Sequence, residues 1–234
     1  MAKLRRDDQH PGSLGDALSP GPGGGDVPAP GPAQWHVETP RGPARIDFDP
    51  PAGQPCSLLV LGHGAGGEVS APDLVAVRDA VTPHGVAVAR VTQPYRVAGR
   101  RAPAPAGHLD EAWLAVVESL ADRRGGAPLL VGGRSSGARV ACRTAVALGA
   151  AGIVALAFPE HPPGKPDRSR AAELLTGVPT LVINGDRDPF GIPAVTPGVE
   201  VRVVPGDHSL KRDPAAVGAF VLGWLVTHGW AARP

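Results

Sequence analysis

The chain has 234 residues, of which 42% are hydrophobic, and both values are ordinary for one globular domain with a full core. Its formal net charge of +1 gives no reason to expect nucleic acid or a membrane surface as a partner. No run approaches the ~20 apolar residues of a membrane span, and the first residues lack a signal-like apolar segment. We therefore expect a cytoplasmic protein.

The cysteine content favours a reducing compartment. There are only two cysteines, Cys56 and Cys142, and no Cys/His cluster has the spacing of metal ligands. We expect two reduced thiols, no metal and no cofactor.

The first part of the chain has a different composition from the rest. Residues 1–33 are dominated by Gly and Pro and carry no apolar periodicity, which predicts a disordered tail. A single domain is then expected over residues 34–234. It opens with apolar and polar residues alternating over 35–38 and 44–48, which is typical of an edge hairpin.

From residue 57 onward, continuous apolar segments alternate with helical ones. Strands are predicted at 57–61, 86–91, 129–131, 153–156, 180–183 and 201–204. Helices are predicted at 72–82, 108–123, 136–148, 170–175 and 214–228. This alternation predicts an α/β fold with a mostly parallel, doubly wound sheet and helices on both faces. The intervals between strands leave no room for a large lid domain.

One stretch has the pattern of a catalytic turn. The predicted strand at 129–131 runs into Gly-Gly-Arg-Ser-Ser-Gly at 132–137, and a helix follows at once. Gly133 and Gly137 lie two residues before and after Ser135, where strand and helix come too close for larger side chains. This G-x-S-x-G pattern predicts Ser135 as a nucleophile, although a glycine-rich turn alone could have the same sequence.

A second glycine-rich loop, at 62–67, follows the predicted strand 57–61. In this context it can supply half of an oxyanion hole, and we expect the donors to be the backbone N–H groups of Ala65 and Ser136. The loop also matches the dinucleotide-binding pattern G-x-G-x-x-G. That alternative requires a helix within the glycines and an acidic residue about 20 positions later, whereas the following strand carries Arg90 near its end.

Acidic residues and a histidine follow two further strands. Asp186 and Asp188 come after the strand at 180–183, and His208 comes after 201–204, so the chain order is Ser, Asp, His. Asp188 is the better candidate to orient the imidazole because it lies far enough beyond the strand to reach it. Asp186 is expected to stabilise its loop, and Glu160 is a third candidate.

Five stretches resemble a small α/β-hydrolase family that includes testis-expressed protein 30 and subunit 3 of the NSL histone acetyltransferase complex, which is grouped loosely with dienelactone-hydrolase-like proteins. These stretches are 63–67, 133–137, 158–166, 185–191 and 207–209. The resemblance implies an α/β-hydrolase fold with Ser135, Asp188 and His208 as the triad. The chain departs from the family at Ser136, where members commonly carry Met, and it has Ser where true dienelactone hydrolases have Cys.

Two functions follow from this pattern. The first is a serine hydrolase that cleaves a carboxylic ester or thioester through an acyl-enzyme on Ser135. The second is a non-catalytic interaction module on the same fold. The sequence determines neither the substrate nor the oligomeric state.

Four further residues are expected to contact a small-molecule substrate: His63, Arg100, Arg134 and His161. The two arginines predict a substrate with negative charge near its acyl carbon, because guanidinium binds two oxygens at once. The alternative is that Arg100 is solvated and that Arg134 makes a structural hydrogen bond.

Overall fold

The computed structural model describes residues 32–233, so the tail predicted for residues 1–33 lies almost entirely outside the described residues. The strands are β1 (Ala33–Val37), β2 (Ala44–Asp49), β3 (Ser57–Gly62), β4 (Val86–Thr92), β5 (Leu129–Arg134), β6 (Gly152–Leu156), β7 (Thr180–Gly185) and β8 (Val199–Val204). The helices are α1 (Pro72–Val81), α2 (Pro94–Val97), α3 (Ala106–Glu118), α4 (Ala121–Arg124), α5 (Ser136–Thr144) and α6 (Pro214–Thr227), with 3₁₀ turns at Thr82–His84 and Ala171–Leu174.

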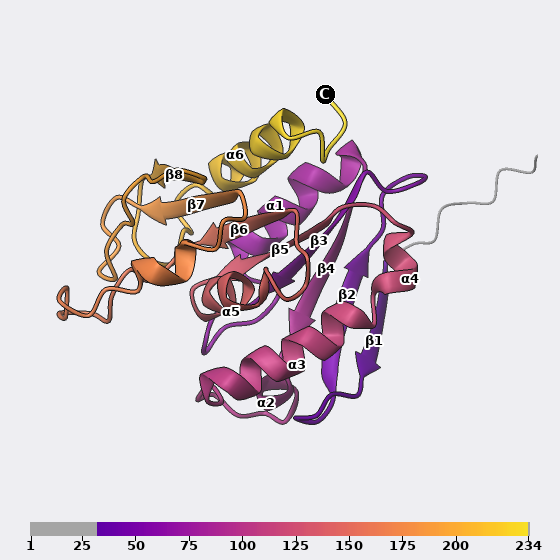
Figure 1. Ribbon diagram of the computed structural model, residues 1–234, viewed down its shortest axis with the longest axis horizontal. Helices are drawn as coiled ribbons and strands as arrows, with labels where there is room; N and C mark the ends of the chain where they lie inside the picture. Colours follow the sequence, from indigo (N-terminus) through magenta and orange to yellow (C-terminus); the bar gives the residue numbers. More distant parts are fainter. Residues whose placement is uncertain (1–31, 234) are drawn as a thin grey trace, which may run out of the picture.

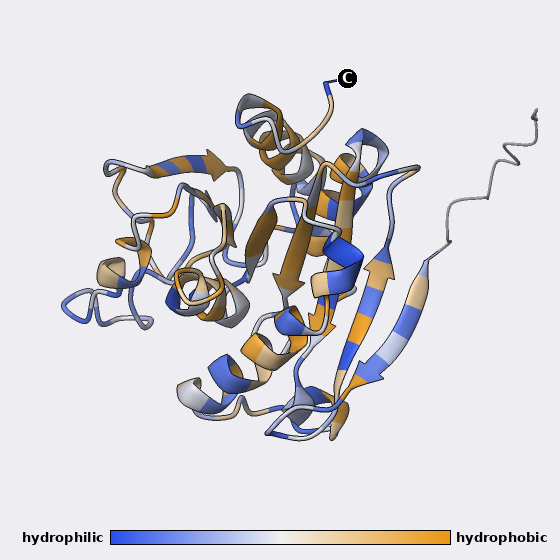
Figure 2. Ribbon diagram, turned by 45° about the vertical axis from the view of Figure 1, so that its right-hand side comes forward, coloured by the Kyte–Doolittle hydropathy of each residue, from blue (hydrophilic) through white to orange (hydrophobic). Residues whose placement is uncertain are grey.

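The eight strands form one twisted sheet in the order β1-β2-β4-β3-β5-β6-β7-β8 (Figure 1). β1 and β2 pair antiparallel and β2 joins β4 antiparallel, which confirms the edge hairpin. The remaining pairs are parallel. Every residue of β3, β4, β6 and β7 is buried, because both faces of a parallel sheet are covered (Figure 2).

Helices cover both faces, as the sequence predicts. One apolar core lies between the sheet and helices α1 and α6, and it includes Leu74 and Trp224. The other lies between the sheet and helices α3 and α5, and it includes the fully buried Trp113. None of the helices in the described part of the chain is long and apolar enough to cross a membrane.

Two predicted helices end earlier in the structure, and one short helix was not predicted. The predicted helix 108–123 begins at Ala106 and ends at Glu118, and Ser119 and Leu120 separate it from α4; Leu120 leaves helical geometry with its side chain fully buried. The predicted helix 136–148 ends at Thr144, whose hydroxyl bonds back to the Val140 carbonyl. α2 has too few residues to show a helical period, and it was not predicted.

The sheet and α5 approach each other most closely where β3 passes β5. A side chain placed on Gly133 would bring its Cβ to 2.4 Å from the Gly62 carbonyl oxygen, and one on Gly137 would come to 2.5 Å from the same atom. Gly133 also has φ of +153°. Both glycines of the G-x-S-x-G pattern are therefore required by the backbone contact itself.

We predict that Gly133→Ala destabilises the protein by about 1–3 kcal/mol or more, because the added methyl group meets backbone that cannot move away. The free energy of unfolding in urea measures this effect. Gly107→Ala is the matched control: it lies exposed in α3 with nothing within 4 Å of the added carbon, and it should stabilise by up to about 1 kcal/mol. Equal effects at the two positions would contradict the close-contact argument.

Candidate active site

Ser135 occupies the sharp turn between β5 and α5. Its φ and ψ are 53° and −112°. Ser135 is one of three non-glycine residues with positive φ among residues 32–233. Its N–H donates to the Leu156 carbonyl at 2.8 Å, so the neighbouring strand holds the turn in place. Such strained backbone costs of order 1–3 kcal/mol and is concentrated at functional sites.

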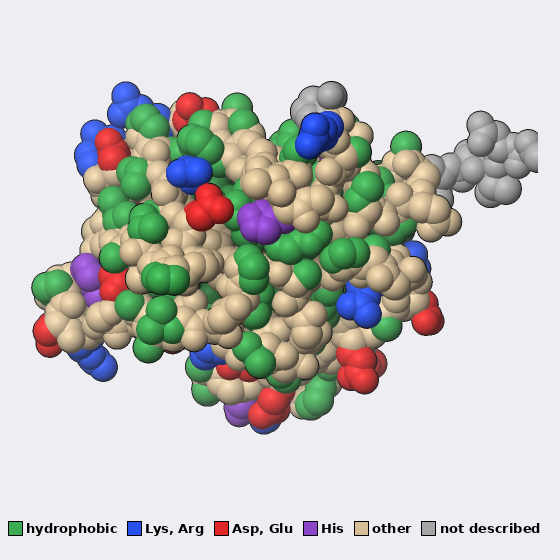
Figure 3. Space-filling view, turned by 45° about the horizontal axis from the view of Figure 1, so that its top comes forward, with side chains coloured by type: hydrophobic (Ala, Val, Ile, Leu, Met, Phe, Trp, Pro, Cys, Tyr) green, Lys and Arg blue, Asp and Glu red, His purple; other side chains and the backbone are tan. Residues whose placement is uncertain are grey.

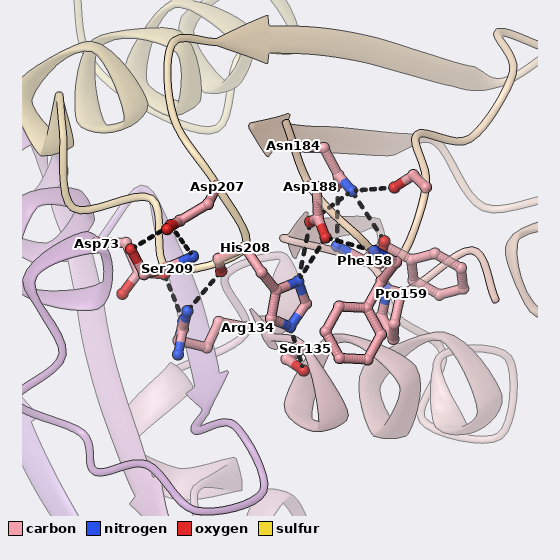
Figure 4. A network of polar contacts seen from close by, with 12 residues as sticks. Asp73, Arg134, Ser135, Phe158, Pro159, Asn184, Asp188, Asp207, His208 and Ser209 are labelled. Atoms are coloured by element: carbon pink, nitrogen blue, oxygen red, sulfur yellow. Dashed lines mark hydrogen bonds and ion pairs between the residues drawn. The ribbon is translucent and has the colours of Figure 1, made fainter. Parts of the chain in front are cut away.

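His208 and Asp188 complete a continuous hydrogen-bonded chain with this serine (Figure 4). His208 Nε2 lies 2.9 Å from Ser135 Oγ. On the other side of the ring, Nδ1 lies 2.8 Å and 3.1 Å from the two carboxylate oxygens of Asp188. The carboxylate side chain is fully shielded from solvent, and the imidazole side chain is 19% exposed. The three groups come from the loops after β5, β7 and β8.

The structure distinguishes the three acidic candidates. Asp188 contacts the imidazole and also accepts hydrogen bonds from the N–H of Phe190 at 2.9 Å and from the amide of the buried Asn184 at 3.3 Å. Asp186 instead accepts from the Gly206 N–H at 2.7 Å and so fastens its own loop to the turn that leads to the histidine. Glu160 bonds to Ser169, away from the imidazole.

The loop after β3 lies against the nucleophile. A Cβ placed on Gly64 would be 3.5 Å from the Cβ of Ser135. The Ala65 N–H has no acceptor among the described residues, and Ser136 is the first residue of α5, where backbone N–H groups lack intrahelical partners. Both N–H groups are thus available for an oxygen that carries developing negative charge.

His63, one of the predicted substrate contacts, is buried in the structure and bonds to backbone on both sides of its ring. The side chain is 3% exposed, its Nδ1–H donates to the Gly64 carbonyl at 2.7 Å, and its Nε2 accepts from the Gln93 N–H at 3.1 Å. Tyr95 adds a second tie, because its hydroxyl donates to the Ala65 carbonyl at 2.6 Å. His63 therefore fixes the shape of the loop.

Burial lowers the pKa of His63 below its ordinary value of 6.5. As the pH falls, the unfolded chain takes up this proton before the folded protein does. The associated stability is therefore present above pH 6.5 and is lost as the pH falls toward the folded-state pKa.

We predict that the free energy of unfolding falls as the pH is lowered from about 7 to about 5.5, and that it falls less in His63→Gln, which lacks the imidazole. Urea unfolding across this range measures both slopes. The other histidines remain in both proteins, so identical slopes would contradict the assignment.

Arg134, another predicted substrate contact, makes two polar contacts within the protein. Its Nε contacts the carboxylate of Asp73 at 2.9 Å, and one terminal nitrogen donates to the His208 carbonyl at 2.7 Å (Figure 4). The Asp73 side chain is completely buried, and burial raises its pKa while the Arg134 charge opposes that shift. The structural alternative for Arg134 is therefore correct: it links α1 to the turn that carries His208.

Replacing Arg134 by Met should destabilise the protein by about 3–5 kcal/mol, because a buried carboxylate then lacks its partner. The double variant Arg134→Met/Asp73→Asn should recover much of this loss, since neither charge remains. Thermal and urea unfolding of the two variants measure the difference. A double variant as unstable as the single one would show that the ion pair is not the cause.

The two remaining substrate candidates lie in separate places. Arg100 is exposed and lines a cavity of about 140 Å³ together with Tyr95 and His108. His161 lies against the other side of the site: its backbone N–H donates to the Phe190 carbonyl, and the Phe190 ring packs 4.2 Å from the ring of His208. The sequence contains no pattern that would single out Phe190, because its role depends on a loop contact.

The structure provides little for the dinucleotide alternative. α1 begins only at Pro72, five residues after the last glycine of the loop at 62–67.

Among residues 32–233, no group of three His, Cys, Asp or Glu side chains is placed to hold a metal ion. Cys142 is buried, which raises the pKa of its thiol to about 12, while Cys56 is exposed.

Residues 55–216 match the model of the alpha/beta hydrolase domain. The chain belongs to the alpha/beta hydrolase family. No curated protein matches it in sequence.

Solved structures with the same fold include serine hydrolases and esterases. An alpha-beta serine hydrolase homologue from Coxiella burnetii has a TM-score of 0.68 at 17% identity, covering 84% of this chain and 99% of its own. An α/β serine hydrolase without a lid from Xanthomonas campestris has a TM-score of 0.66 at 22% identity, covering 87% and 97%. Est1E from Butyrivibrio proteoclasticus has a TM-score of 0.66 at 15% identity, covering 83% and 98%. These likenesses confirm the α/β-hydrolase fold.

Proposed function

We propose that this alpha/beta hydrolase is a serine hydrolase that cleaves a carboxylic ester or thioester of a small molecule. The observation that carries the proposal is the chain of hydrogen bonds from Ser135 Oγ through His208 to Asp188, with distances of 2.9 Å and 2.8 Å. Nucleophile, base and orienting carboxylate are within bonding distance without any rearrangement.

In the first half of the reaction, Ser135 Oγ attacks the substrate carbonyl carbon while its proton passes to His208 Nε2. Asp188 holds the ring with Nδ1 protonated, so that Nε2 is free to accept, and it stabilises the imidazolium that results. The carbonyl oxygen becomes an oxyanion facing the N–H groups of Ala65 and Ser136. The bond between the acyl carbon and the oxygen or sulfur of the leaving group then breaks, and His208 donates its proton to the departing alcohol or thiol.

The second half repeats these roles with water. His208 accepts a proton from a water molecule, whose oxygen attacks the acyl carbon bound to Ser135. Collapse of this second tetrahedral intermediate breaks the bond to Ser135 Oγ, which takes the proton back from the imidazolium. The products are the carboxylic acid and the enzyme in its starting state.

The non-catalytic alternative is less well supported by the same geometry. An interaction module needs neither a strained serine nor a buried carboxylate aligned on a histidine, and both have an energetic cost. The narrower kinship with the family of testis-expressed protein 30 and NSL subunit 3, and the cytoplasmic location, stay predictions.

Since Arg134 is paired with Asp73, a preference for negative charge near the acyl carbon now depends on Arg100, beside His108 in the cavity of about 140 Å³. Two further proteins with this fold, the esterase domain of a Rhodothermus marinus protein and an esterase from Pyrobaculum calidifontis, favour an ester as the first substrate class to test.

Ser135→Ala should abolish ester hydrolysis and labelling by a fluorophosphonate probe, because Ser135 Oγ is the hydroxyl that bonds to His208 Nε2 among residues 32–233. Ser136→Ala is the control: it keeps the backbone N–H and should retain labelling. A panel of p-nitrophenyl esters and acyl-CoA thioesters gives the rates. Labelling that survives Ser135→Ala and disappears in Ser136→Ala would show that Ser136, and not Ser135, is the nucleophile.

Asp188→Asn should lower kcat by about 10⁴, because the amide no longer holds the imidazole in the reactive tautomer. Asp186→Asn should cost far less in kcat, since that side chain contacts the Gly206 backbone and not the imidazole. Steady-state kinetics on the best substrate of the panel measure both. A larger loss of kcat in Asp186→Asn than in Asp188→Asn would reverse the assignment.

A further inference from the structure

Phe190 lies against the imidazole of His208, outside the chain of hydrogen bonds that joins His208 to Ser135 and Asp188. The centroids of the phenyl and imidazole rings are 4.2 Å apart, and the two planes are inclined by 31°. An edge-on pair would have nearly perpendicular planes, so the imidazole lies over the face of the phenyl ring. That face carries the negative part of the ring's quadrupole.

Backbone hydrogen bonds hold Phe190 in this position. Its N–H donates to a carboxylate oxygen of Asp188 at 2.9 Å, and its carbonyl accepts from the His161 N–H at 3.0 Å. The next residue closes a tight turn: the Gly191 N–H donates to the Asp188 carbonyl at 3.1 Å, and the Gly191 carbonyl accepts from the Asn184 amide at 3.0 Å. The phenyl ring and the carboxylate that contact the imidazole are thus parts of one short loop.

The turn is built from residues that favour its shape. Pro189 occupies the second position, where its fixed φ is favourable. Gly191 ends the turn with φ of +81°, which residues with a side chain rarely adopt. The phenyl ring is therefore in place before any charge develops on the imidazole, so the site needs no reorganisation to use it.

The charge of His208 changes during the proposed reaction. Its ring is an imidazolium in both halves of the cycle, while it holds the proton taken from Ser135 or from water. A cation within about 6 Å of an aromatic centroid is attracted by the ring face, and the attraction grows where water is excluded. The imidazole side chain is 19% exposed. An interaction that favours the imidazolium over the neutral ring stabilises the transition state more than the ground state.

We propose that Phe190 is a positioning residue of this site, whose ring face stabilises the imidazolium of His208 and so accelerates both proton transfers. Asp188 orients the imidazole through Nδ1 at its edge, and Phe190 supports it from its face. The effect on the reaction rests on the proposed function, whereas the attraction between the phenyl ring and the imidazolium does not.

Fluorinated phenylalanines incorporated at position 190 test the ring face with little change of shape. Each fluorine withdraws electron density from the face, so mono-, di- and trifluorinated phenylalanine should weaken the attraction in that order. The titration of His208, followed by NMR of its imidazole, should move stepwise to lower pH, by about 0.5 unit in the trifluorinated protein. This readout requires no substrate and no hydrolysis.

The other charged and titratable groups around the imidazole stay the same in this series. They are Asp188 after β7, Arg134 at the end of β5, Asp207 in the histidine's own loop and His161 after β6. A shift that follows the number of fluorine atoms therefore reports the ring face.

Steady-state kinetics on the best ester of the panel give the second readout. kcat should fall along the fluorinated series, and Phe190→Leu, which is apolar but has no ring, should lose about three- to thirtyfold in kcat. KM should change less, because the attraction forms with the imidazolium and not with the bound ester. Phe190→Tyr keeps the aromatic face and should retain most of kcat.

Phe220 is the matched control. It is 39% exposed on α6, on the side of the molecule that Figure 3 turns forward, and it lines the groove between α6 and β8. The same fluorinated residues at position 220 should leave both the His208 titration and kcat unchanged. Circular dichroism of every variant confirms that it is folded.

A His208 titration that stays constant across the fluorinated series, or that moves to higher pH, would overturn the proposal. So would equal losses of kcat in Phe190→Leu and Phe190→Tyr, which would show that the ring only fills space. Wild-type protein that hydrolyses none of the esters or thioesters would contradict the proposed function alone, since the titration still measures the attraction between the phenyl ring and the imidazolium.

Discussion

The backbone contact between β3 and the turn that follows β5 is the constraint on which the site depends. Two glycines, Gly133 and Gly137, let the Gly62 carbonyl approach so closely that no side chain fits between them. Because β3 and α5 meet there, the loop that leaves β3 comes to lie directly against Ser135. Nucleophile and backbone donors are therefore brought together by one contact, and the strained φ of Ser135 is held by the packing around it.

Side chains that bind backbone hold the surrounding loops. His63 and Tyr95 fasten the loop after β3, while Arg134 and Asp186 fasten the turn that leads to His208. A buried ion pair such as Arg134 with Asp73 contributes little net stability, since removing both charges from water costs nearly what their attraction returns. Its contribution here is geometric: it holds a backbone carbonyl of the residue whose imidazole bonds to Ser135.

Much of this architecture could be predicted from the sequence, because it leaves periodic or local signals. Apolar runs predicted the parallel strands, and the pattern of glycines around Ser135 predicted the turn. The position of Asp188, five residues beyond Ile183, predicted its reach to the histidine. The backbone contacts of His63 were not predicted, and the sequence left Arg134 open between a substrate contact and a structural hydrogen bond, because the sequence around a histidine or arginine does not show whether its side chain faces substrate or backbone. Partners such as Gln93 and Asp73 lie 30 and 61 residues away.

The order of the three site residues along the chain also has a consequence for synthesis. Ser135 directly follows a central strand, but its histidine follows β8, which is both the last strand in sequence and the outermost on its side of the sheet. A growing polypeptide therefore completes the nucleophile turn 73 residues before it reaches the residue that bonds to it. A nascent chain that has already built the centre of its sheet still lacks its base. The histidine joins the site only when the sheet has acquired its final edge.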